Sequence, residues 1–505
     1  MNEPSPLSVL TLNCWGLTFT RNDRRDRMRA IGHHLASTES STYDIVGLQE
    51  VWAYEDFVLV RDIVSEAFPF AKHWMSGLFG SGLVVLSKYP IKSTSLRRYA
   101  LNGDPWPILH GDWFDGKSCA SAVILHPTVG EIEVFNTHMH ASYDPIGTPD
   151  RYLGCRISQA WEMAGLIRTA NDLGRHVIAL GDFNSPPDSL IVSLLTRYAG
   201  LADSWRCVHP YSQDPQSTLP RGGLTPEQGI ALLGITCDTP LNSWTPHAAW
   251  INQLTEDPIG ERLDYIFFNQ KQGRMACIDV KVALHEPVAG IGGLSKRKNL
   301  SDHFAVHATF SVTHGRPRSP QIQQQDVPHH RSLSTPVSRS TTDGEGNNEA
   351  DVNDEDIELL ERVRLALEQH LIKAQKRSTR VLAFLTPFFL LVTLGLLLGM
   401  LWVDHVYYDN GDNYADADAD NNRTRGRHFS SNPSFQSSHR NTNNNTLFLM
   451  SMAIGLSISS SCWVASLLYG FFYGGETISG FVNAIQEVQA YLEGHHRGYN
   501  NINIG

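Results

Sequence analysis

Hydrophobic and polar positions follow two patterns over the first 313 residues of the chain. Short apolar runs bounded by polar residues predict buried strands, and longer segments at 24–36 and 150–173 are typical of helices. Asp150 is placed to cap the second of these helices. Strands are expected at 8–13, 44–50, 82–87, 120–125, 132–137, 177–180, 263–268 and 304–310. This mixture predicts one α/β domain with layered sheets over residues 1–313.

The pattern changes completely after residue 313. Residues 314–355 have few apolar positions and are expected to form a disordered linker. Apolar residues then recur every three or four positions over 356–380, which predicts an amphipathic helix. Two uncharged apolar segments, 381–403 and 447–473, each exceed the ~20 residues that cross a bilayer. They predict a transmembrane hairpin, with a polar acidic loop at 404–446 and a C-terminal tail at 474–505.

Basic residues indicate how this hairpin is oriented. Lys373, Lys376, Arg377 and Arg380 directly precede the first span, so that side is expected to face the cytosol. The connecting loop carries glycosylation sequons at Asn422 and Asn444, which would be usable only on a luminal side. Arg440 stands near the second span on that same side and weakens the bias. The protein is therefore expected to be integral to the endoplasmic reticulum or another internal membrane, with its α/β domain in the cytosol.

Charge and cysteine content narrow the class of protein. The whole chain has a formal net charge of −11, and residues 1–313 hold 26 Lys and Arg against 32 Asp and Glu, or −6. A nucleic-acid partner is not expected, because such partners require a basic surface. The 7 cysteines are scattered without a C-x-x-C pair, which is typical of reduced thiols and offers no zinc site.

Candidate chemistry gathers where the predicted strands end. Asp182 and Asn184 directly follow one apolar run, and Pro186 and Pro187 prevent the strand from continuing. This short segment alone could equally be an ordinary turn. Other strand ends or strands carry similar polar groups, namely Asn13, Glu50, His138, Asp264, Asp302 and His303. Polar side chains in the loops at strand ends are how α/β sheets build functional sites.

Taken in order, these segments resemble the endonuclease/exonuclease/phosphatase superfamily over nearly all of the first 310 residues. Within it, the chain is similar to neutral sphingomyelinases and fungal inositol phosphosphingolipid phospholipases C. The segments that carry this similarity are L-N-C-W-G at 12–16, G-L-Q-E-V-W at 47–52, S-G-L-V-V-L-S at 81–87, N-T-H-M-H-A at 136–141 and C-D-T-P-L-N-S-W at 237–244. The resemblance implies a two-layered β-sandwich flanked by helices and Mg²⁺-dependent hydrolysis of a phosphate ester.

Cleavage of a phosphodiester assigns roles to some of these residues. Glu50 offers the hard oxygen ligand that Mg²⁺ prefers, and Asn13 is expected to assist at the metal or its phosphate. His303 is the candidate general base for the attacking water, oriented by Asp264 or Asp182. The resemblance further implies that Asp182 and Asn184 position water and phosphate. It also implies that His138 contacts the phosphoryl oxygens and that Asp302 lies next to the metal or His138.

The segment G-D-W-F-D-G-K-S at 111–118 fits a phosphate-binding-loop pattern. A strand is expected directly after it, where a nucleotide-binding loop requires a helix, so no nucleotide site is predicted. Because a lysine of this loop matters for activity in the related lipases, Lys117 is a candidate phosphate contact. The alternatives are a mobile lid residue that pairs with Asp115 and an ordinary surface lysine.

The combined prediction is a membrane-embedded, Mg²⁺-dependent phospholipase C that hydrolyses sphingomyelin or inositol phosphosphingolipid to ceramide and a phosphorylated headgroup. Its partners would be the lipid substrate and anionic phospholipids as activators, which basic residues at 296–298 could attract. The oligomeric state stays open. The alternatives are a nuclease or inositol-phosphate phosphatase of the same superfamily, or a catalytically inactive membrane tether.

Overall fold

Two six-stranded sheets form the part of the chain that carries these polar segments. In the computed structural model the described residues are 5–17, 23–37, 43–78, 80–105, 111–144, 148–209, 223–245, 259–270, 275–312, 354–424 and 435–502. They divide into two units, residues 1–365 with 488–505, and residues 366–487. The predicted linker lies almost entirely outside the described residues, since only 354 and 355 are described.

The first sheet has the strand order β11-β14-β1-β2-β4-β3. Its strands are β1 (Ser5–Asn13), β2 (Ile45–Gln49), β3 (Phe70–Trp74), β4 (Leu83–Ser87), β11 (Met275–Ala283) and β14 (Ala305–Val312). The second sheet has the order β5-β6-β7-β8-β10-β9. Its strands are β5 (Ile91–Arg98), β6 (Ser118–His126), β7 (Gly130–His138), β8 (His176–Asp182), β9 (Leu201–Asp203) and β10 (Asp264–Asn269). A separate hairpin joins β12 (Val288–Gly290) to β13 (Gly293–Lys298).

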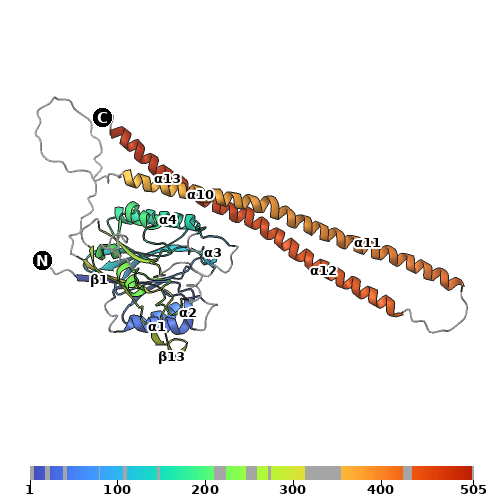
Figure 1. Ribbon diagram of the computed structural model, residues 1–505, viewed down its shortest axis with the longest axis horizontal. Helices are drawn as coiled ribbons and strands as arrows, with labels where there is room; N and C mark the ends of the chain where they lie inside the picture. The colour runs from blue at the N-terminus through green and yellow to red at the C-terminus, as the bar shows by residue number, and fades with distance from the viewer. Residues whose placement is uncertain are drawn as a thin grey trace, which may run out of the picture. The chain divides into compact units, whose positions relative to one another are not determined.

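Helices cover the outer faces of this sandwich, with α4 on one side and α1 and α2 on the other (Figure 1). The helices of this unit are α1 (Arg24–Ala36), α2 (Tyr54–Val64), α3 (Asp112–Asp115), α4 (Leu153–Asp172), α5 (Leu190–Ser193), α6 (Ser204–Val208) and α8 (Pro226–Gln228), with π-helical turns η2 (Leu194–Tyr198) and η4 (Gly229–Leu233). The predicted two-layered sandwich with flanking helices is confirmed. The predicted cap of α4 is wrong, because Tyr152 occupies the N-cap position and Asp150 pairs with Arg156 instead.

Alternation of apolar side chains along β1 explains why the sheets stack. Val9 belongs to the core cluster between the two sheets, whereas Leu10 belongs to the cluster beneath α1 and α2. Successive side chains of a strand point to opposite faces, so both faces of this strand are buried. The sheets approach closely at Gly47, where a Cβ atom would lie 2.1 Å from Leu180 Cδ1.

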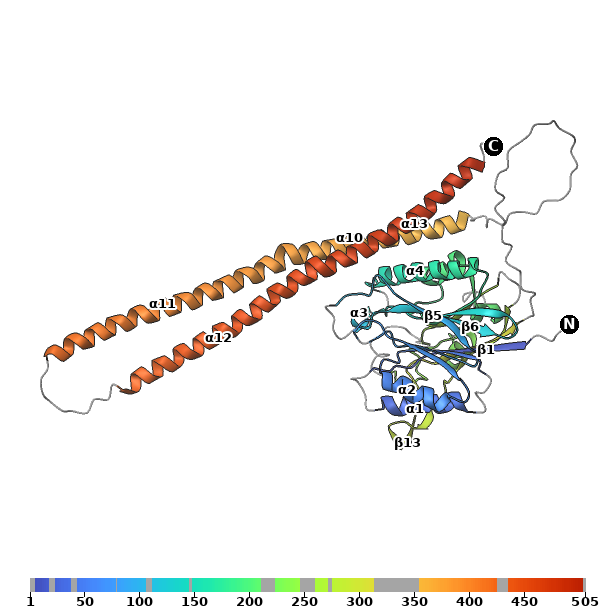
Figure 2. The same ribbon diagram turned by 180° about the vertical axis from the view of Figure 1, so that it is seen from behind.

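The second unit contains the middle parts of two long helical segments. The first runs through α10 (Asp354–Arg380), η5 (Val381–Leu385) and α11 (Thr386–Thr424), and the second through α12 (Phe435–Leu467), η6 (Leu468–Tyr473) and α13 (Gly474–Ile502). Each contains a window apolar enough to cross a membrane, with mean hydropathies of 2.5 and 1.7. Figure 2 shows α11 and α12 side by side, and the Thr393 and Ser459 hydroxyls are 2.9 Å apart between them. Residues 404–424, predicted to be part of a loop, continue α11 as a helix.

We expect Gly47→Ala to lower the unfolding midpoint of the protein in detergent micelles. The added methyl group collides with Leu180, and overpacking of this kind costs ~1–3 kcal/mol. Gly165→Ala is the matched control, because this exposed position of α4 has no atom within 4 Å of the new Cβ. Alanine in a helix interior is favoured over glycine by ~0.5–1 kcal/mol, so the control should be neutral or stabilising. Equal thermal midpoints for the two variants would contradict close packing of the sheets here.

Candidate active site

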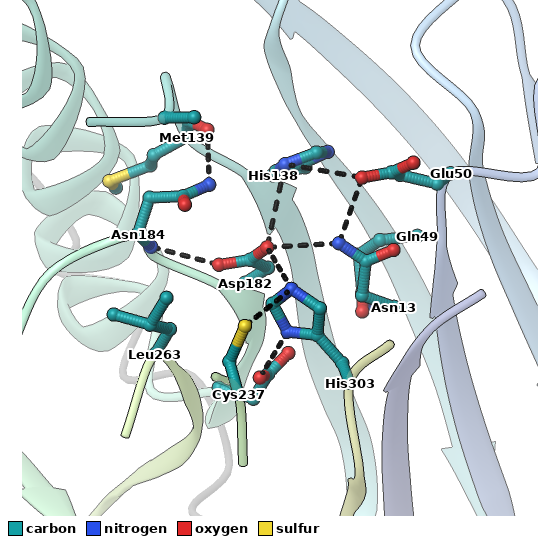
Figure 3. A network of polar contacts seen from close by, with 12 residues as sticks. Asn13, Gln49, Glu50, His138, Met139, Asp182, Asn184, Cys237, Leu263 and His303 are labelled. Carbon is teal, nitrogen blue, oxygen red and sulfur yellow. Dashed lines mark hydrogen bonds and ion pairs between the residues drawn. The ribbon is translucent and has the colours of Figure 1, made fainter. Parts of the chain in front are cut away.

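Strand pairing brings three of the predicted site residues into one row. β8 pairs in parallel with β7, which places Asp182 opposite His138, and antiparallel with β10, which places Asp182 opposite Asp264. All three side chains are at least 95% buried. Figure 3 shows Asp182 central to the network, between His138 and His303. The register of one sheet therefore assembles residues that lie far apart in the sequence.

His303 and Asp264 form a closely hydrogen-bonded pair. His303 Nδ1 lies 2.8 Å from Asp264 Oδ2, so a proton on Nδ1 leaves Nε2 as the basic atom. Nε2 is directed toward Asp182 Oδ2, at 3.9 Å, and Cys237 Sγ, at 3.4 Å. Burial lowers the pKa of His303, but the neighbouring Cys237 and two carboxylates outweigh burial and hold this pKa well above its usual range. The pair has the geometry of a general base and its orienting carboxylate.

Asp182 is held by donors on both of its oxygens. Asn13 Nδ2 donates to Oδ2 at 2.9 Å, and the backbone N–H of Asn184 donates to Oδ1 at 2.9 Å. Burial and the nearby negative charge of Asp264 raise the pKa of Asp182 to about 7. Asn184 has a φ of 46°, and its side-chain amide donates to Met139 O at 3.0 Å. Hydrogen bonds thus fix Asp182 and Asn184 at the end of β8, where the sequence predicts that the strand stops.

Glu50 reaches the same region from the end of the first sheet's β2. Asn13 Nδ2 donates to its Oε1 at 3.0 Å, and Trp52 Nε1 contacts its Oε2 at 3.4 Å. Its backbone has a φ of 57°, and its carbonyl oxygen would lie 2.0 Å from a Cβ added at Gly16. This close approach explains why a glycine stands at position 16. Glu50 also raises the pKa of Asp302, to about 6, after the larger effect of burial.

The residues present fit a hard divalent cation. Glu50 and Asp302 are neighbouring negative groups, and a cation between them would relieve the repulsion that raises the pKa of Asp302. Ligand atoms of Asp182, Asp264 and His303 also lie within 4.8 Å of one another. We favour the Glu50 side, because a metal in the second group would have to break the His303–Asp264 hydrogen bond. Carboxylate oxygens are the ligands that Mg²⁺ prefers.

Asn13 is oriented differently from a metal ligand. Its amide nitrogen points toward Glu50 and Asp182, whereas its Oδ1 accepts a hydrogen bond from the backbone N–H of Trp15 at 3.0 Å. In this arrangement Asn13 orients the carboxylates rather than offering them a competing oxygen. Its predicted contact with the metal stays a prediction.

Lys117 lies buried between His138 and a carboxylate. Its Nζ is 2.7 Å from Asp112 Oδ1 and 3.0 Å from each ring nitrogen of His138. Although burial opposes it, the negative charges led by Asp112 raise the pKa of Lys117. Burial, followed by the charge of Lys117, holds the pKa of His138 well below its usual range. His138 is therefore a neutral hydrogen-bonding group beside a fixed cation.

The surroundings of Lys117 are not those of a nucleotide-binding loop. Strand β6 begins at Ser118, directly after the lysine, where such a loop would open a helix. The alternative of an ordinary surface lysine is wrong as well, since Lys117 is 3% exposed.

Two residues that contact this network were not predicted from the sequence. Cys237 belongs to the segment 237–244 that carries the family resemblance, with no role expected for it, yet its thiol lies 3.4 Å from His303 Nε2. The charge of Arg27 gives no sign of its burial, yet it is 2% exposed. Its spacing of four and eight residues from the buried Ile31 and Leu35 places it on the apolar side of α1, and this signal could have identified it.

A buried imidazole–carboxylate pair beside further carboxylates, at the strand ends of an α/β sandwich, provides the groups that a phosphate-ester hydrolase needs to activate water. The chain belongs to the Endonuclease/Exonuclease/phosphatase family, whose sequence profile matches residues 10–303.

Known relatives of the chain share this region. The Inositol phosphosphingolipids phospholipase C of Schizosaccharomyces pombe is 36% identical over 311 residues, which cover 61% of this chain and 70% of the relative. Sphingomyelin phosphodiesterase 2 of Homo sapiens is 32% identical, covering 62% and 66%. The Inositol phosphosphingolipids phospholipase C of Saccharomyces cerevisiae is 34% identical, covering 61% and 64%. The matched region thus spans about two thirds of the length of these relatives.

Solved structures also resemble the chain. The crystal structure of SmcL aligns with a TM-score of 0.44 at 16% identity, covering 61% of this chain and 99% of that one. The sphingomyelinase C of Streptomyces griseocarneus aligns with a TM-score of 0.41 at 19% identity, covering 60% and 99%.

We expect Asp264→Asn to reduce kcat for phosphodiester hydrolysis by ~10²–10⁴-fold, because His303 loses the carboxylate that fixes its basic atom. The general base must be neutral, so activity falls at pH values below the pKa of His303. Removing the negative charge of Asp264 lowers that pKa, and the acid limb of the pH–rate profile should move to lower pH. Glu286→Gln, an exposed carboxylate, is the control. An acid limb that stays in place would refute the pairing as the determinant of His303 protonation.

Proposed function

We propose that the protein is a membrane-embedded, Mg²⁺-dependent phospholipase C acting on sphingolipids. It would hydrolyse sphingomyelin or inositol phosphosphingolipid to ceramide and a phosphorylated headgroup. The observation that carries this proposal is the His303–Asp264 pair beside Asp182 and Glu50, in a chain that resembles enzymes with these substrates in their names.

The geometry supports a direct attack of water on the phosphorus. Nε2 of His303 takes the proton of the attacking water, while Nδ1–H stays with Asp264, which stabilises the imidazolium that forms. Asp182 lies 3.9 Å from the same Nε2, and with Asn184 it would hold the water and the phosphate in line. These two residues are fixed before substrate binds, because each is hydrogen-bonded at the end of β8.

The negative charge of the phosphate would be neutralised by a cation held near Glu50. Glu50, steadied by Asn13, would hold Mg²⁺, with Asp302 close by; when bound, this ion neutralises phosphate charge and stabilises the leaving oxygen. Lys117 would supply a second positive charge at His138, and the neutral imidazole would donate a hydrogen bond through its N–H to a phosphoryl oxygen.

The two apolar helical segments support a lipid substrate. We assign residues 1–313 to the catalytic domain and residues 381–403 and 447–473 to the membrane-crossing parts. The amphipathic segment 356–380 would lie next to the membrane, and residues 404–446 would connect the spans on the luminal side. The basic residues before the first span favour a catalytic domain in the cytosol, on the endoplasmic reticulum or another internal membrane. Anionic phospholipids would act as activators.

A panel of sphingolipids in mixed micelles with anionic phospholipid tests this function. We expect Mg²⁺-dependent release of phosphocholine or phosphoinositol, together with ceramide, because His303 would activate water close to Glu50, the proposed Mg²⁺ ligand. The His303→Ala variant is the inactive control, and His33→Ala, an exposed histidine of α1, is the matched control. The proposal is wrong if no sphingolipid is hydrolysed. Nicking of plasmid DNA, or release of phosphate from inositol phosphates, would then identify another activity of the family.

Glu50→Gln should weaken the apparent affinity for Mg²⁺ at least about tenfold, the smaller effect seen even for outer partners of metal ligands. The reason is that an amide provides no negative charge to the cation. The rate is measured against free Mg²⁺ after removal of metal by a chelator. Glu55→Gln changes an exposed carboxylate of α2 and should leave the midpoint unchanged. An equal Mg²⁺ midpoint for Glu50→Gln and the wild-type protein would exclude Glu50 as the ligand.

A further inference from the structure

We propose that Arg27 is a positioning residue for the cation pocket, by which we mean the surroundings of Glu50 and Asp302. It acts through the backbone of Cys14 and Trp15. The inference rests on the proposed metal-dependent function. Arg27 contacts no reacting group, and its effect passes through hydrogen bonds to Asn13 and Glu50. The hydrogen bonds that its guanidinium donates go to backbone carbonyl oxygens rather than to a carboxylate.

The guanidinium instead holds three backbone carbonyl oxygens. Nη1 donates to Cys14 O at 2.7 Å and to Leu300 O at 3.2 Å, and Nη2 donates to Trp15 O at 2.6 Å. These carbonyls belong to the end of the first strand and to the segment that leads into His303. Arginine suits this task, because its donors are fixed in a plane and it stays charged when buried. A lysine could not satisfy three carbonyls in these directions.

Two tryptophan rings complete the enclosure of Arg27. Its guanidinium carbon lies 4.9 Å from the ring centre of Trp15 and 5.8 Å from that of Trp244, and the two rings meet edge to face at 5.4 Å. Trp244 Nε1 donates to Asn299 O at 2.7 Å, which ties the same segment from its other side. The side chain is therefore locked in one orientation by stacking as well as by hydrogen bonds.

A continuous series of contacts leads from this enclosure to the cation pocket. Arg27 fixes the carbonyl of Trp15, whose backbone has a φ of 48°, in the sparsely populated left-handed region. The N–H of Trp15 donates to Asn13 Oδ1 at 3.0 Å, which turns the amide nitrogen of Asn13 toward Glu50, at 3.0 Å. Without this donor, the Asn13 amide could rotate and present its oxygen to the carboxylate. The orientation of Glu50 thus depends on a side chain in α1.

The guanidinium of Arg27 also contacts the segment that leads into His303. Leu300 O accepts from Arg27, and the next residue, Ser301, donates through Oγ to Asn13 O at 2.6 Å. Asp302 and His303 follow directly. Asp302 and Glu50 both stabilise the charge of Arg27, after the larger, opposing effect of burial on its pKa. Arg27 therefore joins the strand that carries Asn13 to the segment that carries Asp302.

Binding of Mn²⁺ to the full-length protein in detergent micelles, followed by the electron paramagnetic resonance signal of free Mn²⁺, tests this role. We expect Arg27→Met to weaken Mn²⁺ binding about tenfold, and the Mg²⁺ midpoint of the hydrolysis rate to rise by a similar factor. Arg27→Lys keeps the charge but not the planar fork, so its affinity should stay close to that of Arg27→Met. Saturating Mg²⁺ should restore part of the lost rate.

Two further variants keep the outcome interpretable. Arg24→Met, one turn earlier on α1, breaks the ion pair with Asp56 and should lower stability while leaving Mn²⁺ affinity unchanged. Ser301→Ala removes the link to Asn13 together with the hydroxyl's contacts to Asp302 Oδ1 and the His303 N–H. It should weaken Mn²⁺ binding in the same direction if Arg27→Met does not fold.

Wild-type affinity in Arg27→Met, or in Ser301→Ala where Arg27→Met is unfolded, would overturn the inference and leave the proposed function intact. Full rescue by Arg27→Lys would also overturn it, because charge rather than the fork would then be responsible. A wild-type protein that binds no Mn²⁺ and hydrolyses no sphingolipid would refute the proposed function together with the inference.

Discussion

The pairing of β8 with β7 and β10 is the constraint on which the candidate site depends. It places His138, Asp182 and Asp264 in adjacent positions of one sheet, and a shift of one residue would turn every side chain of the strand to the opposite face. Buried ionisable groups are costly unless each finds a partner. Here Asp264 is hydrogen-bonded to His303, Asp182 accepts from Asn13, and His138 contacts Lys117. The strand register thus lowers the cost of burying these ionisable groups and places them where they can act together.

The second sheet alone cannot complete the site, because the cation side comes from the first sheet. Asn13 and Glu50 stand at the ends of the parallel strands β1 and β2. Close approach of the sheets at Gly47 brings these ends within reach of Asp182. Asn13 bridges the two halves, because its single amide nitrogen donates to one carboxylate from each. The His303–Asp264 pair also joins the sheets, because His303 lies just before β14 of the first sheet and Asp264 begins β10 of the second. Loss of packing between the sheets would therefore disturb the metal side and this pair together.

Much of the site could be predicted from the sequence because polar residues that interrupt or end apolar runs stand out. Asp182, Asp264 and His138 were recognisable in this way, and the layered fold followed from the same runs. Strand β5 was missed, because it lies at a sheet edge with mostly exposed side chains and no apolar alternation. Arg27 was missed for the opposite reason, since charge suggested exposure although its helical position faces the core. Partners that satisfy a buried charge come from distant segments, and sequence spacing does not show them.

Lys117, beside His138, provides positive charge for an anion at a position separate from the candidate base, His303. A protonated His138 would place a second positive charge 3.0 Å from the ammonium of Lys117, which burial makes unfavourable. His138 is accordingly held neutral, whereas His303, surrounded by carboxylates, readily accepts a proton. Both histidines lie near Asp182, but His138 also contacts the ammonium of Lys117, whereas His303 is hydrogen-bonded to Asp264. The phosphate would then meet fixed positive charge on the Lys117 side, and the attacking water would meet basicity on the Asp264 side.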